Sequence, residues 1–177
     1  MNATMTLENA KHYPVMLNQI LSIISPQHGG MFIDCTLGGG GYSRAILEFP
    51  KTKVVAIDRD SIAAKYANGI SKEFPSRFKF FQDKFSNLNQ LVEPNSNPRA
   101  IIFDLGLSSF QIADDQRGFS FKSNGPLNMQ MGINTYSVFE AVNNLNKNDL
   151  VDIIKTLGEE KEAKKIVNAI VRNRIKK

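Results

Sequence analysis

Three aspartates, Asp34, Asp58 and Asp104, end segments of the sequence that are expected to form buried strands. Ligands of parallel sheets bind over the carboxyl ends of the strands, so we expect these three side chains to converge on one cleft. A carboxylate at the tip of a second strand can accept hydrogen bonds from both hydroxyls of an adenosine ribose, and we assign this role to Asp58. The alternative for Asp58 is a helix N-cap. Together the three residues predict a cofactor that contains adenosine.

A glycine-rich loop, Gly38 to Gly41, follows the first of these strands. Glycines at the start of a helix let a ligand approach bare backbone. Gly38, Gly40 and Ser43 fit the dinucleotide-binding fingerprint, except that Ser43 replaces its last glycine. The alternative is that the glycines only make a tight turn between strand and helix. By itself the loop therefore indicates a ligand without identifying it.

The carboxylate of Asp34 distinguishes between two adenosine cofactors. NAD would bring a pyrophosphate to the loop, where a neighbouring carboxylate repels it, whereas S-adenosylmethionine carries a cationic sulfonium and an ammonium group. Asp34 thus favours S-adenosylmethionine and disfavours a nicotinamide-dependent oxidoreductase. Phe85 is expected either beside an adenine or in the core. His12 and His28 lack metal-ligand spacing, so no metal site is predicted.

The apolar pattern along the chain alternates between strand and helix periods. Strands are predicted over residues 31–35, 53–58, 78–81 and 99–105, and helices over 15–24, 41–49, 61–72 and 85–92. Ser61 is expected to cap the third of these helices. The alternation predicts a Rossmann-like α/β half with four parallel strands over residues 1–110. A helical subdomain is predicted over residues 111–177, with helices at 137–145, 148–157 and 159–174.

Composition and charge narrow the class of protein. The 177 residues are 42% hydrophobic, enough for a domain with a buried core, and a single cysteine excludes a disulfide framework within the chain. No apolar run approaches the ~18 residues of a spanning helix, so we expect a cytoplasmic protein without a membrane partner. The net charge of +5 is concentrated in residues 161–177. This basic end is expected either to bind RNA phosphates or to be a solvated helix face.

Seven segments of the sequence, in order, resemble the ribosomal small-subunit RNA cytosine-N(4) methyltransferase family, known as RsmH or MraW. The segments that carry the resemblance are KHYPVML, IDCTLGGGGYSRAIL, AIDRD, DKFSNL, FDLGLSSFQIADDQRGFSF, GPLNMQM and GEEKEAKKIVNAIV. The resemblance covers almost the whole chain from Lys11 onward. Its DLGLSSFQ and RGFSF motifs are far more specific than the glycine loop.

This resemblance implies an S-adenosylmethionine-dependent enzyme that methylates the exocyclic N(4) amine of one cytidine in 16S ribosomal RNA of the small ribosomal subunit. It also implies a methyltransferase sheet with a helical substrate-binding domain inserted after the fourth strand. It leaves the catalytic residue unknown, with Asp104 a candidate for accepting a proton or orienting the amine. The implied cofactor-binding residues are Gly40, Gly41, Tyr42, Asp58, Phe85, Asp104 and Gln111.

The sequence departs from the family pattern in three places. Tyr42 stands where the family usually has histidine, and Asn128 and Gln130 stand where it commonly has aspartate and arginine. A sheet of this family has about seven strands, and only four are predicted here, as expected of a chain truncated at its C-terminus. We expect residues 99–105 to form an exposed edge that a second chain or a second copy completes. The alternative function is a catalytically inactive remnant that binds the cofactor or RNA.

Overall fold

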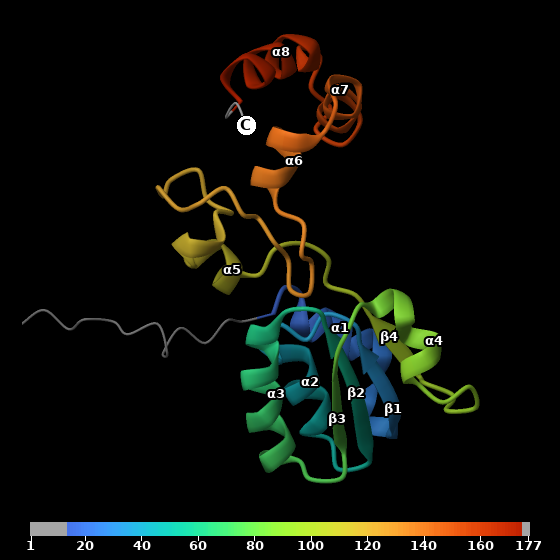
Figure 1. Cartoon of the computed structure of the whole chain (residues 1–177). Coiled ribbons are helices and arrows are strands. Elements are labelled where there is room, and N and C mark those ends of the chain that lie inside the picture. The colour runs from blue at the N-terminus through green and yellow to red at the C-terminus, as the bar shows by residue number, and fades with distance from the viewer. Residues whose placement is uncertain (1–13, 175–177) are drawn as a thin grey trace, which may run out of the picture. The chain divides into compact units, whose positions relative to one another are not determined.

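The computed structural model describes residues 14–174, which separate into two compact units between Ser109 and Phe110. Figure 1 shows that the first unit contains the sheet and that the second is built from loops and helices. Lys11, His12 and residues 175–177 of the basic end, which the sequence analysis includes, lie outside the described range.

The first unit is built on a four-stranded sheet in the order β3-β2-β1-β4, in which every pairing is parallel. The prediction of four parallel strands is therefore confirmed. Asp34, the last residue of β1, pairs with Ala56 of β2 on one side and with Ile102 of β4 on the other. The strands are β1 (Gly30–Asp34), β2 (Thr52–Asp58), β3 (Phe78–Gln82) and β4 (Ala100–Ile102).

Helices cover both faces of this sheet. One face packs Phe32 and Val54 against α1 (Leu17–Ile24), α2 (Gly41–Leu47) and α3 (Ser61–Glu73). The other face has a smaller core, where apolar residues of α4 (Leu88–Leu91) pack against Ile33, Cys35 and Ile57. Figure 1 shows the sheet between α3 and α4. Burial on both faces explains why the strands are continuously apolar.

Two elements are shorter than predicted. β4 spans only Ala100–Ile102 within the predicted 99–105, because beyond Ile102 the chain leaves the backbone ladder of β1. The predicted helix at 85–92 is a 3-10 turn, Phe85–Asn87, followed by α4. Its first turn is tightened by the Asp83 carboxylate, which accepts hydrogen bonds from the Lys84 amide and the Asn87 side chain.

The helix after β2 begins where the sequence predicts, but its cap is a different residue. Ser61 is the first helical residue, and the side chain of Asp60 accepts a 3.1 Å hydrogen bond from the Ile62 amide. Asp60 is therefore the N-cap, so both the prediction of Ser61 as the cap and the alternative N-cap role of Asp58 are wrong. This leaves the carboxylate of Asp58 at the strand end rather than in the helix.

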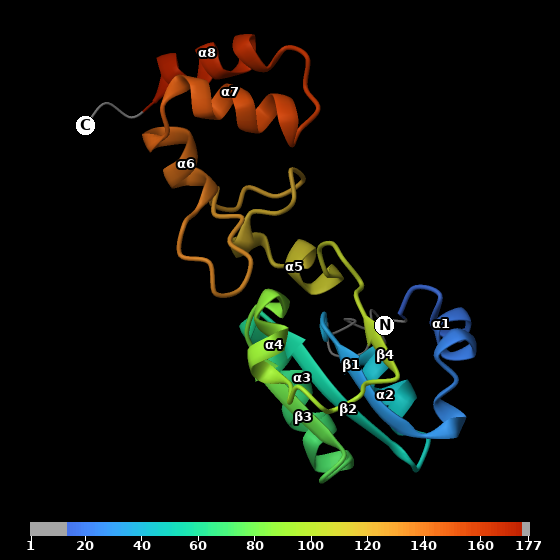
Figure 2. The same ribbon diagram turned by 90° about the vertical axis from the view of Figure 1, so that its right-hand side faces the viewer.

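The second unit contains the three predicted helices, α6 (Val138–Asn144), α7 (Lys147–Thr156) and α8 (Ala163–Asn173). Figure 2 shows α7 and α8 side by side. α6 starts with a capping box in which Ser137 and Glu140 bond reciprocally. α8 starts four residues later than the predicted 159, because Glu159 has a positive φ of 51°. A further short helix, α5 (Ser109–Ala113), was not predicted.

Within residues 14–174, every helix is too short or too polar to cross a bilayer.

Candidate cofactor-binding site

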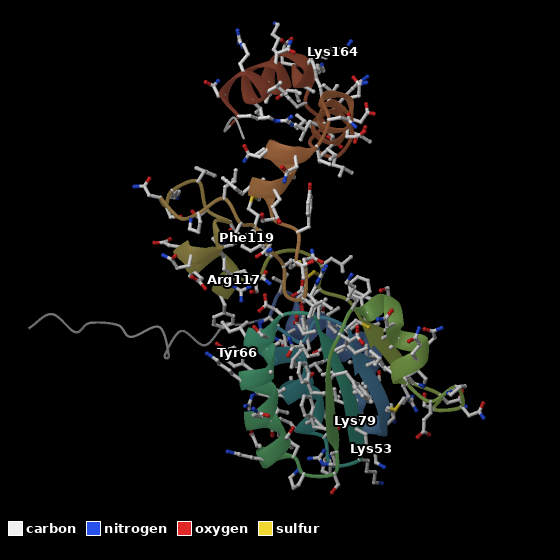
Figure 3. The ribbon with its side chains drawn as sticks, in the orientation of Figure 1. Lys53, Tyr66, Lys79, Arg117, Phe119 and Lys164 are labelled. Atoms are coloured by element: carbon white, nitrogen blue, oxygen red, sulfur yellow. The ribbon has the colours of Figure 1, made fainter. Side chains whose placement is uncertain are left out.

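The structure brings the three strand-end aspartates together at the end of the sheet where the strands have their carboxyl ends. Asp34 and Asp58 are the last residues of β1 and β2, and Asp104 lies two residues beyond β4, so all three follow neighbouring strands. The negative charges of Asp58 and Asp104 each contribute to raising the pKa of Asp34, as expected for carboxylates held close together. Lys53 and Lys79 lie toward the opposite end of the sheet (Figure 3). The end of the sheet that carries the three carboxylates is therefore suited to bind a cation.

Asp34 is the deepest of the three and is fully buried. Its Oδ2 accepts a 2.7 Å hydrogen bond from the Ser43 hydroxyl, and its Oδ1 accepts a 3.3 Å bond from the Thr36 amide. Burial raises the pKa of this carboxyl to about 6, although the Ser43 bond lowers it. Because the side chain of Asp34 is not exposed, it influences the site through its charge and through its hydrogen bonds with Ser43 and Thr36.

Asp58 is half-buried and is tied to the glycine loop. Its Oδ2 accepts a 2.8 Å hydrogen bond from the Gly38 amide, and its Oδ1 accepts a 2.8 Å bond from the Asp60 amide. Burial raises the pKa of Asp58, while these two bonds lower it. A carboxylate oxygen can accept more than one hydrogen bond, so both oxygens keep acceptor capacity. The residue is thus fixed in place and still able to accept bonds from ribose hydroxyls.

Asp104 is exposed, and its backbone is anchored by a side chain of the β1 loop. The Asp104 amide donates a 2.8 Å hydrogen bond to the Thr36 hydroxyl. Sequence reasoning missed Thr36. The signal that could have found it is a β-branched hydroxyl residue placed two positions after a strand-end aspartate.

The glycine loop has packing reasons for its composition. Gly40 has a φ of 81°, and a Cβ there would lie 2.4 Å from the Cδ1 of Ile70. A Cβ on Gly41 would lie 2.2 Å from the Cγ of Pro14. Tyr42 follows with its side chain buried and its hydroxyl donating to the Val15 carbonyl. The side chain of Tyr42 therefore anchors the N-terminal segment, which leaves its backbone for any contact with a ligand.

Phe85 lies three residues after β3 and pairs with an aromatic residue that the sequence analysis missed. Phe85 and Phe103 are both exposed, and their rings form an edge-to-face contact with centroids 5.4 Å apart. The sequence predicts that Phe103 lies within a strand of seven residues, whereas in the structure β4 ends before Phe103. Phe103 is the residue directly before Asp104, so the aromatic pair lies beside the acidic strand end.

The remaining predicted site residue, Gln111, and the two departures from the family pattern belong to the second unit. Gln111 is buried on α5. Asn128 donates a 3.4 Å hydrogen bond to the Gln116 carbonyl, and Gln130 donates a 3.0 Å bond to the Thr135 carbonyl. Both amides therefore bond to backbone carbonyls of the second unit.

Comparison with known proteins finds relatives of this chain. The chain is 43% identical over 169 residues to a protein named ribosomal RNA small subunit methyltransferase H from Wolbachia sp. subsp. Drosophila simulans, covering 94% of the chain and 58% of that relative. Proteins of the same name from Gluconobacter oxydans and Rhodospirillum rubrum are 42% and 39% identical. Those alignments cover 97% and 92% of the chain but only 53% and 51% of the relatives.

The chain thus spans somewhat more than half the length of the curated relatives that it matches. Its glycine loop, strand-end carboxylates and helical second unit all fall within residues 9–177, which match the model of the MraW methylase family. The chain belongs to the MraW methylase family.

Proposed function

We propose that the chain binds S-adenosylmethionine and acts in the cytoplasm in methyl transfer to the N(4) amine of a cytidine in 16S ribosomal RNA. The observation that carries this proposal is the set of three carboxylates at adjoining strand ends, of which Asp34 is fully buried. Carboxylates attract the sulfonium and ammonium groups of S-adenosylmethionine and repel the pyrophosphate of NAD. The names of the 39–43% identical relatives support the methyltransferase function and its ribosomal RNA substrate.

The residues of the first unit fit the parts of this cofactor. Asp58 has free acceptor capacity for the ribose hydroxyls, and Phe85 offers an exposed ring for the adenine. The backbone of Gly40, Gly41 and Tyr42 offers the glycine loop's contacts to the cofactor. Asp104 carries an exposed carboxylate for the cationic end of the ligand. When bound, the cofactor supplies a methyl group made electrophilic by the sulfonium.

Gln111 is proposed as a cofactor-binding residue on the resemblance alone. It is buried on α5. The amine of cytosine is a poor nucleophile, because its lone pair is delocalised into the ring. The protein must therefore orient the amine and accept its proton, and the base must leave its stack. Asp104, the exposed carboxylate of the three, is our candidate for orienting the amine or accepting the proton.

The exposed face of α8 is a candidate surface for RNA phosphates. Ala163 and Val167 are buried on one side of the helix, so its other side faces solvent. Figure 3 labels one of the basic residues, Lys164, on this helix. Four exposed basic residues form what we call the α8 basic face: Lys161, which lies two residues before the helix, and Lys164, Lys165 and Arg172 on the helix itself.

The other described basic residue at this end has a structural role. Arg174 donates hydrogen bonds to the Val142 and Leu145 carbonyls at the end of α6. Lys165 forms an ion pair with Glu162, which lowers the net charge of the α8 basic face. The alternative of a purely solvated helix face therefore predicts no loss of RNA binding when Lys164 and Arg172 are neutralised.

We also propose a polypeptide partner for the edge of the sheet. Within the described residues, β4 pairs with β1 alone, and Ile101 in this strand and Phe103 just after it are 44% and 48% exposed. An apolar edge strand with one open side favours pairing with another strand. As the partner we propose a second chain that adds a strand to this open edge. A second copy of this chain is the other outcome of the test.

The test of this function is methyl transfer to small ribosomal subunits that lack the modification. We expect the chain, alone or with the polypeptide that completes its sheet, to convert cytidine in 16S RNA to N(4)-methylcytidine, detected by mass spectrometry of nucleosides. The Asp104→Asn variant is the control and should lower the rate. Saturable binding of S-adenosylmethionine without any methylcytidine, in both preparations, would contradict catalysis and support the inactive remnant instead.

A further inference from the structure

Residues 35–38, which join β1 to the glycine loop, bond to strand ends on both sides of β1. On the β4 side, the Cys35 amide donates a 2.9 Å hydrogen bond to the Ile102 carbonyl. On the β2 side, the Leu37 amide donates a 3.1 Å hydrogen bond to the Ile57 carbonyl. The segment therefore continues both ladders of the sheet beyond the last paired residue of β1, and its position fixes the ends of its neighbours.

The side chain of Thr36 continues this pattern where the backbone ladder with β4 stops. Its Oγ1 accepts the 2.8 Å hydrogen bond from the Asp104 amide, and its own amide donates at 3.3 Å to Oδ1 of Asp34. Thr36 thus bonds to two of the three residues that supply carboxylates. A β-branched side chain is stiff about χ1, so the direction of this acceptor is well defined.

The same segment holds the third carboxylate through Gly38, whose amide donates a 2.8 Å hydrogen bond to Oδ2 of Asp58. Gly38 bonds to the Asp58 side chain itself, whereas Thr36 bonds to the backbone of Asp104 and leaves its carboxylate exposed. The two contacts therefore work differently. One fixes a carboxylate directly, and the other fixes the backbone from which a carboxylate projects.

We infer that Thr36 is a positioning residue, whose hydroxyl fixes the backbone at Asp104 and so sets how that carboxylate meets the cationic end of the cofactor. The inference rests on the proposed function, because it takes S-adenosylmethionine as the ligand. Asp104 is exposed and lies beyond the end of β4, so it has no backbone ladder to hold it. Without the hydroxyl, the Asp104 amide loses the only partner that the described structure gives it.

The experiment compares three forms of the full chain, the wild type, Thr36→Val and Thr36→Ser. Valine keeps the shape of threonine and removes the acceptor, whereas serine keeps the acceptor. We expect Thr36→Val to raise the Kd for S-adenosylmethionine about three- to tenfold, the effect of one lost hydrogen bond, and Thr36→Ser to change it less than about twofold. Thr36→Ala, which adds no methyl group in place of the hydroxyl, is the second variant if Thr36→Val fails to fold.

A double-mutant cycle with Asp104→Asn separates positioning from general support of the loop. If Thr36 acts through the Asp104 carboxylate, Thr36→Val should weaken cofactor binding much less in the Asp104→Asn background. An equal fold-change in both backgrounds would overturn the inference, because the hydroxyl would then support the loop without regard to the carboxylate. Loss of binding in Thr36→Ser equal to that in Thr36→Val would overturn it too.

Hydrogen exchange of the Asp104 amide gives a readout that needs no ligand. We expect this amide to exchange at least about threefold faster in Thr36→Val than in the wild type, and at the wild-type rate in Thr36→Ser. Failure of the wild type to bind S-adenosylmethionine would contradict the proposed function, and the exchange rates would still decide the role of the hydroxyl. Unchanged exchange in Thr36→Val would overturn the inference.

Discussion

The hydroxyl of Ser43 donates a 2.7 Å hydrogen bond to the carboxylate of Asp34, and both residues are fully buried. This contact explains why a serine stands where a dinucleotide-binding fingerprint has its last glycine. A glycine at that position would leave one oxygen of a buried carboxylate without this donor, which is costly in an apolar setting. The departure from the fingerprint and the acidic strand end are therefore parts of the same arrangement.

The stability of the fold should depend on the ionisation of Asp34. Because burial raises its pKa from 3.8 to about 6, the unfolded chain loses this proton first as pH rises. The folded state thus loses stability between about pH 4 and pH 6, by on the order of 3 kcal/mol. Asp34→Asn cannot ionise, so we expect it to unfold at higher denaturant concentration than the wild type at pH 7.

The measurement is urea unfolding of the wild type and Asp34→Asn at several pH values. The two curves should lie closest together near pH 3, where Asp34 is largely protonated in both the folded and the unfolded state, and should separate steadily up to about pH 6. A free energy difference that does not change with pH would contradict a raised pKa for Asp34.

Removal of the Ser43 hydroxyl should destabilise the ionised form of Asp34. The Ser43 bond lowers the pKa of Asp34, so Ser43→Ala should raise that pKa further and cost roughly 1.5–3 kcal/mol of unfolding free energy at pH 7. The loss should be smaller at pH 4. Ser61→Ala, which removes a hydroxyl from the exposed first residue of α3, is the control and should change stability by less than about 0.5 kcal/mol. Equal losses from Ser43→Ala at both pH values would show that the charge of Asp34 does not matter.

Neutralising the α8 basic face should weaken RNA binding in a salt-dependent way. In Lys164→Gln with Arg172→Gln, we expect the slope of log K against log salt to fall by about 1 to 2, because each phosphate contact contributes roughly 0.7 to 0.9. Lys51→Gln with Lys53→Gln removes the same charge from exposed residues of the first unit, and it is the matched control. Equal effects of the two pairs would mean that only net charge matters.

The apolar edge at β4 should make the isolated chain self-associate. Ile101 is 44% exposed beside this open edge, so Ile101→Lys should shift sedimentation toward the monomer. Ile23→Lys is the matched control, because Ile23 is 77% exposed on α1, outside the sheet. A wild-type chain that is a monodisperse monomer with a sharp cooperative melt would contradict the prediction.

The sheet and the convergence of its carboxylates were predictable from the sequence, because strand-end aspartates after apolar runs must meet at one edge of a parallel sheet. The support beneath them was not. Ser43 and Thr36 serve this site through hydrogen bonds to Asp34 and Asp104, and such pairings depend on the position of α2 and β4 in space. The local sequence shows a hydroxyl residue near Asp34 in each case, but it does not show which atoms these hydroxyls bond.

Misplaced element ends have a similar cause. The cap of α3 is Asp60 rather than Ser61 because either residue type can cap a helix, and only the backbone geometry selects between them. The sequence predicts Phe103 as an interior strand residue, because the apolar residues on both sides of it continue the strand pattern. The structure ends β4 at Ile102, so Phe103 lies free to pair with Phe85.

The most direct test of the central claim is calorimetric titration of the folded chain with S-adenosylmethionine, with NAD as the comparison ligand. The account predicts saturable binding of S-adenosylmethionine alone, weakened roughly tenfold or more in Asp58→Asn, whose amide accepts fewer ribose hydrogen bonds. Binding of NAD, or of neither ligand, by the folded wild type would contradict the claim that these three strand ends form a site for the methyl donor.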